Sequence, residues 1–153
     1  MSLNRIPQAV QDTVHILAKL KSRLLKPSVV LALGDYVASP AFLRVIIQEK
    51  NKAAHGLAES DVSNNDKMIF NACRKIIDAR VMSCLEDVPG AKGLMVYLEV
   101  MRNIHYAYLK IDMTPEIRIE LMWTSTSFFR TWRESLLSFY TVDKNFITGN
   151  SLA

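Results

Sequence analysis

Residues 11–27, QDTVHILAKLKSRLLKP, carry the clearest structural signal in the chain. Apolar and small residues recur there at the spacing of one helical face, in the series Thr13, Leu17, Leu20 and Leu24. Asp12 or Thr13 can cap such a helix, because a short side-chain oxygen accepts from the free N–H groups of a first turn. Pro27 ends it, because a residue before proline is disfavoured in the helical region. We therefore expect a helix that begins at Asp12 or Thr13 and ends near Leu25.

The rest of the chain predicts more helices. Apolar residues recur at helical spacing over residues 40–50, 66–86, 91–111 and 115–139. Ser39-Pro40 and Thr114-Pro115 mark two helix starts, because proline is well accepted at the first helical position. The apolar run 29–33 predicts either a buried strand or one helical turn, and residues 51–65 predict a connecting loop with a short turn near residues 57–62. The fold expected for residues 1–153 is a single all-α domain, a bundle of about five helices.

The last expected helix is rich in aromatic residues. Ile117, Phe128 and Trp132 mark its expected inner side, and Trp123 is expected to widen that apolar stripe. Arg130 and Arg133 are interleaved with these rings. Rings and cations together can form a nucleic-acid surface. The helical wheel favours the alternative, a core stripe with a solvated edge.

The positive charge lies at one end of the chain. The formal net charge is +4, and residues 1–30 hold one acidic residue, Asp12, against Arg5, Lys19, Lys21, Arg23 and Lys26. A basic end is compatible with nucleic-acid binding. It is also what an ordinary solvated helix face looks like, and charge alone favours that simpler interpretation.

Composition excludes several classes of protein. No apolar run approaches the roughly 18 residues of a membrane span, and residues 1–5 lack the apolar core of a signal peptide, so we expect an intracellular protein with no membrane partner. Cys73 and Cys84 lie on one expected helix, roughly 16 Å apart, too far for a disulfide. We expect both to be buried. The common phosphate-loop, dinucleotide, serine-hydrolase, zinc-protease and EF-hand motifs do not occur.

Three histidines are the remaining candidates for chemistry. Asp12 and His15 lie three residues apart, so they fall on adjacent surface of one turn and could share a divalent metal or an acid–base task. Asp12 could equally serve only as a helix cap. His105 is expected to be partly buried and hydrogen-bonded, and His55, in the expected loop, carries no clear signal.

The segment from Asp12 to Leu25 resembles part of the P-element-like (THAP-associated) transposases. In that family the second catalytic Asp is followed by a similar pattern of His, an aliphatic residue and cations. Further similar features are Lys26-Pro27-Ser28, Pro89-Gly90, residues 128–133 (FFRTWR) and residues 145–150 (NFITGN). The family core is an RNase H-like fold that holds metal with acidic residues. The resemblance implies that residues 1–27 derive from the edge of that core, 28–140 from its helical insertion, and 141–153 form a polar tail.

The resemblance also implies roles for particular residues. Asp12 would be an ancestral Mg²⁺ ligand with His15 as an auxiliary group, and DNA would contact Lys19, Lys21, Arg23, Lys26, Arg130 and Arg133. A complete metal site needs acidic residues before and after this segment, and this chain has none at the family positions. We therefore expect a transposase-derived fragment, inactive alone and without its own cofactor, that binds DNA in the nucleus through its basic end. The alternative is a helical protein–protein interaction module, which predicts an exposed apolar patch.

Overall fold

Helices dominate the observed fold, which confirms the all-α expectation. The computed structural model describes residues 8–63 and 69–134. Its elements are α1 (Gln8–Leu25), β1 (Leu31–Leu33), β2 (Tyr36–Ala38), α2 (Ala41–Glu49), α3 (Lys52–His55), the 3₁₀ helix η1 (Glu59–Val62), α4 (Ile69–Ile76), α5 (Ala79–Leu85), α6 (Lys92–Leu109) and α7 (Pro115–Glu134). Short helices account for the difference from the five expected.

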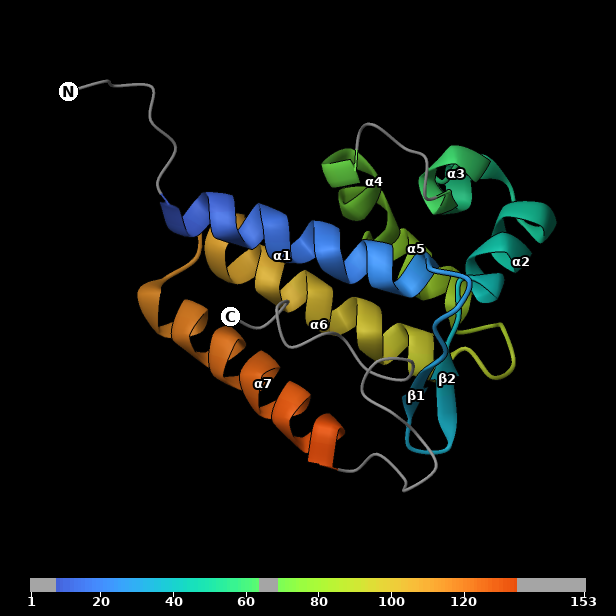
Figure 1. The fold of residues 1–153 in the computed structure, drawn as a ribbon. Helices are drawn as coiled ribbons and strands as arrows, with labels where there is room; N and C mark the ends of the chain where they lie inside the picture. The colour runs from blue at the N-terminus through green and yellow to red at the C-terminus, as the bar shows by residue number, and fades with distance from the viewer. Residues whose placement is uncertain (1–7, 64–68, 135–153) are drawn as a thin grey trace.

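Three long helices form the body of the bundle (Figure 1). Helix α6 lies between α1 and α7 and packs against both, while α2 to α5 gather beside the second half of α1. The antiparallel hairpin β1–β2 covers the end where α6 begins. Among the described helices, α7 therefore has one long neighbour, α6, on its inner side.

Helix α1 has the inner face that the sequence predicts, since Leu17, Leu20 and Leu24 are buried. Its start is different. The helix begins at Gln8, so Asp12 lies inside it and neither Asp12 nor Thr13 is the cap. Apolar burial against α6 and α4 stabilises this helix along its length.

The expected helix over residues 66–86 is interrupted. Helix α4 ends at Ile76 and α5 begins at Ala79, because the Asp78 carboxylate caps α5 and accepts a hydrogen bond of 2.8 Å from the Arg80 N–H. Cys73 and Cys84 therefore lie on two helices. Both are buried, as expected, and neither forms a disulfide within the described residues.

The apolar run 29–33 supplies strand β1, and Gly34-Asp35 forms the two-residue turn to β2. Of these two turn residues, Gly34 alone has a positive φ, +61°, which matches the first central position of a type II′ turn. The hairpin packs closely on α6. A Cβ added at Gly93 would lie 2.9 Å from the Cβ of Tyr36, so only glycine allows this approach without movement.

Two aromatic residues join the separate parts of the core. The buried Tyr97 hydroxyl on α6 donates a 2.8 Å hydrogen bond to the Leu20 carbonyl on α1. The Tyr97 ring meets Trp132 of α7 edge-on, with centroids 6.1 Å apart. The Trp132 indole N–H donates to the Ala32 carbonyl of β1. These contacts fix α1, the hairpin and the inner side of α7 around α6.

Candidate interaction site

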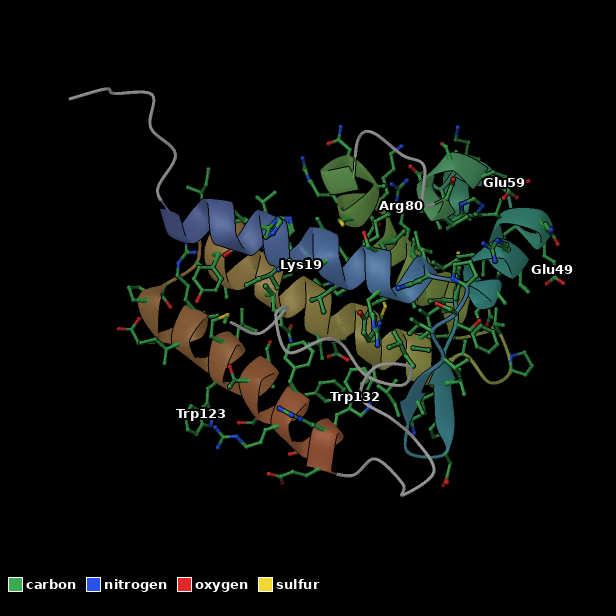
Figure 2. All side chains as sticks on the ribbon, in the orientation of Figure 1. Lys19, Glu49, Glu59, Arg80, Trp123 and Trp132 are labelled. Carbon is green, nitrogen blue, oxygen red and sulfur yellow. The ribbon has the colours of Figure 1, made fainter. Side chains whose placement is uncertain are left out.

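Helix α7 has two contrasting faces. Trp123 and Trp132 are nine residues apart, or two and a half helical turns, so they point to opposite sides. Trp132 is 4% exposed, whereas Trp123 is 73% exposed. Figure 2 shows Trp132 directed into the bundle and Trp123 directed away from it. The expectation that Trp123 would widen the core stripe is therefore wrong.

The inner face of α7 is held by a small number of groups. Phe129 and Ser125 are buried with Trp132, and the Ser125 hydroxyl donates to the Leu121 carbonyl at 2.9 Å. Phe128 packs against the core from one side. Ile117, expected on this face, is about half exposed because it lies at the flank of the stripe. The helix is thus anchored mainly through its second half.

We define the outer face of α7 as the exposed residues that lie opposite Trp132 on the helical wheel. Two of them, Ile119 and Trp123, are large apolar side chains one turn apart, and Ile119 is 71% exposed. The others are small or charged. The members are Glu116, Ile119, Glu120, Trp123, Thr126, Ser127, Arg130 and Glu134.

An apolar groove adjoins the outer face between α6 and α7. Its volume is about 620 Å³, and it is lined by Ala107, Tyr108, Arg118, Ile119, Met122, Trp123 and Thr126. Arg118 braces the groove, since its guanidinium donates to the carbonyls of Ala107 at 2.8 Å and Lys110 at 2.5 Å. These bonds fix the turn from α6 to α7. They also occupy the Arg118 donors, so this cation supports the shape of the groove.

The residues of the outer face and groove suit recognition better than catalysis. The groove lining contains no carboxylate, histidine or cysteine that could act as an acid, base or nucleophile. It does contain aromatic and flexible apolar side chains together, which is typical of protein-binding surfaces.

The resemblance implies that Asp12 is a Mg²⁺ ligand, and such an ion needs further ligands close to it. Asp12 lies within α1, and its side chain is outside the part described; His15, one turn further, is exposed. Within the described residues no three His, Cys, Asp or Glu side chains lie close enough together to hold a metal ion. The described residues do not assemble a Mg²⁺ site, and the role of Asp12 stays a prediction.

The six cations named for DNA binding have different environments. Lys21 is 2% exposed and Arg23 is 9% exposed. Burial raises the pKa of the Tyr97 hydroxyl, and the nearby Arg23 charge partly offsets that rise, so Arg23 lies near the core. Lys19 is half-buried. Lys26, Arg130 and Arg133 are exposed and remain available to a partner.

Two of the three histidines, His55 and His105, are wholly or partly buried. His55 is buried: its Nδ1 accepts from the Leu57 N–H at 2.9 Å, and its Nε2 lies 3.3 Å from the Lys50 carbonyl. It therefore organises the loop after α2. His105 on α6 is half-buried, as expected, and burial together with the Arg74 charge lowers its pKa.

The sequence analysis did not single out Ile119, and it predicted Trp123 in the interior because aromatic residues at helical spacing are usually core. A signal was available. Trp123 lies 180° from Trp132 on the wheel but close to Arg130, so a single inner face cannot hold both tryptophans.

Comparison with protein-family models, curated proteins and solved structures gave no match. The transposase ancestry therefore remains a prediction carried by the resemblance of residues 12–25 and the later segments. Among the residues described, no helix has the length and apolar character needed to cross a membrane.

Proposed function

We propose that this chain is a helical protein-interaction module that binds its partner through the outer face of α7 and the adjoining groove. The observation that carries the proposal is Trp123, an indole 73% exposed beside Ile119 and an apolar groove. Large apolar side chains gathered at one surface are typical of interaction sites.

The energetic reason is the cost of leaving these groups in water. Burying a large apolar side chain gains roughly 1.5–3 kcal/mol relative to leaving it exposed, and tryptophan is among the residues that most often dominate binding energy. The groove runs beside a helix and is shaped by the braced Arg118. An amphipathic helix fits such a surface, with apolar anchors one turn apart.

The second candidate function is DNA binding by a transposase-derived fragment. It is favoured by three exposed cations, Lys26, Arg130 and Arg133. Burial of Lys21 and Arg23 weakens the role proposed for α1, because buried cations cannot meet phosphates. If DNA is the partner, affinity for duplex DNA falls steeply with salt, and Arg130→Ala with Arg133→Ala weakens it. No binding at low salt would exclude this function.

Site-specific photo-crosslinking tests the proposed interaction. A photo-reactive phenylalanine analogue replaces Trp123 in the full chain, and matched chains carry it at Glu49 on α2 or Ser22 on α1, both exposed and outside α7. We expect protein adducts from position 123 in cells and few from the control positions. Equal yields at all three positions, or none at 123, would contradict the proposal. Adduct mass separates self-association from binding to another protein.

A further inference from the structure

The charges on the outer face of α7 are ordered along the helix. Glu116 and Glu120 lie in its first half, whereas Arg130 lies in its second half with exposed Arg133 beside it. Within residues 8–63 and 69–134, neither Glu120 nor Arg130 has an ion-pair partner. The first half of the outer face therefore carries two carboxylates, whereas the second half carries Arg130 and Glu134 with Arg133 at its flank, and Trp123 lies near the middle.

We infer that the outer face of α7 binds the same face of a second copy of this chain, with the two helices antiparallel. The inference rests on the proposed function and names its partner. In a parallel pair Glu120 would face Glu120 and Arg130 would face Arg130, which is unfavourable. An antiparallel pair places the acidic first half of each helix over the second half of the other, where Arg130 and Arg133 lie.

The register follows from the positions of these residues. When the twofold axis crosses α7 at the level of Ser125 but on the outer side of the helix, Glu120 faces Arg130 of the second copy, and symmetry forms the same pair again at the other end. Glu116 then faces Glu134 of the other copy, so the two outermost contacts are unfavourable and the two central Glu120–Arg130 pairs are the favourable ones. Both Glu120–Arg130 pairs lie about one and a half turns from the axis, close to the centre of the interface.

Side-chain size is complementary in the same register. Trp123 of one copy meets the small residues Thr126 and Ser127 of the other, and this leaves room for the indole beside the facing helix. The groove of about 620 Å³ adjoins this point and can accept the edge of the ring. A parallel pair would instead place Trp123 against Trp123. Size and charge therefore favour the same antiparallel arrangement independently.

The expected strength of this association is modest. The 20 residues of α7 span roughly 30 Å, and one helix pair of this length buries an area at the low end of specific interfaces. The dimer is therefore reversible and depends on concentration. Two symmetric Trp123 anchors supply most of the binding energy.

Sedimentation analysis of the full chain over a range of concentrations tests the inference by charge exchange. We expect the wild type to form a dimer. Glu120→Arg alone or Arg130→Glu alone puts like charges opposite each other and weakens dimerisation roughly tenfold. The double variant restores opposite charges and brings affinity back to within about threefold of the wild type. Trp123→Ala weakens it by about a hundredfold or more.

The matched control is Glu49→Arg, an exposed position on α2 at the far end of the molecule from α7 (Figure 2), which should leave dimerisation unchanged. Circular dichroism verifies that each variant folds. A monomeric wild type, or a double variant that fails to recover, would overturn the inference. If the wild type is monomeric while position 123 still crosslinks to a different protein, the inference fails and the proposed function stands. If neither occurs, both fail.

Discussion

Helices α1 and α7 are both amphipathic and both carry cations, yet the bundle uses them in opposite ways. Helix α1 packs against α6 and α4, and its Lys21 and Arg23 are drawn into the interior. Helix α7 packs mainly on α6 and leaves Ile119, Trp123 and Arg130 in solvent. The number of packing neighbours, more than the residue type, decides which side chains are available to a partner.

This difference has a functional consequence. The basic segment that looks most suited to nucleic acid buries Lys21 and Arg23, whereas a helix that looks like core exposes Ile119 and Trp123. Breaking α1 should therefore damage the fold, and changing the outer face of α7 should damage association alone.

The largest expected effect comes from Leu20→Ala on the inner face of α1. Leu20 is fully buried, and removing its side chain leaves a cavity against α6, which costs about 3 kcal/mol of unfolding free energy. The matched variant Ile119→Ala on α7 should cost less than about 0.5 kcal/mol. Chemical denaturation at concentrations where the chain is monomeric measures both. Similar losses for the two variants would contradict the assignment of core and surface.

A smaller contrast is expected between the two tryptophans. Trp132→Phe removes the hydrogen bond to the Ala32 carbonyl and part of the packing against Tyr97. We expect it to lower the unfolding free energy by about 2 kcal/mol. Trp123→Phe, the same chemical change at an exposed site, should alter it by less than about 0.5 kcal/mol. Thermal and denaturant unfolding of the two variants provide the comparison, and an equal loss would show that Trp123 also packs in the monomer.

The smallest expected effect concerns pH and the central helix α6. Burial, and then the Arg74 charge, lower the pKa of His105, so the folded state favours the neutral ring. Stability is unaffected above about pH 6.5 and falls as the pH drops from there through the lowered pKa, because the unfolded chain binds the proton more readily. His105→Gln should lose less stability than the wild type between about pH 7.5 and about pH 5.5. An identical loss in both would exclude His105 as the source.

Much of the fold could be predicted from the sequence because its signals are local. Thr114-Pro115 marks the start of α7, and the Thr114 hydroxyl accepts from the Ile117 N–H at 3.4 Å. The apolar spacing that predicts the buried face of α1, with Leu17 and Leu20, is an equally local signal. The break at Asp78 was not predicted, since α4 and α5 continue one apolar stripe and only the cap separates them.

The candidate site was harder to predict because it depends on which helices are neighbours. Cations are normally solvated, so the sequence predicts Lys21 and Arg23 at the surface, whereas both are buried on a helix that packs against α4 and α6. Aromatic residues normally fill cores, so the sequence predicts an interior position for Trp123. The open side of α7 follows from the order of α1, α6 and α7 in space, which no local pattern contains.

Hydroxyl-radical footprinting of the wild-type chain by mass spectrometry tests most directly whether the outer face of α7 is the interaction surface. At low concentration Trp123 should be oxidised rapidly and Trp132 slowly, in line with their exposure. At high concentration the Trp123 rate should fall several-fold, while exposed Tyr36 on the hairpin keeps its rate. Slow oxidation of Trp123 in the monomer would contradict the claim that the outer face of α7 is the interaction surface. So would a Trp123 oxidation rate that changes in parallel with the Tyr36 rate at every concentration.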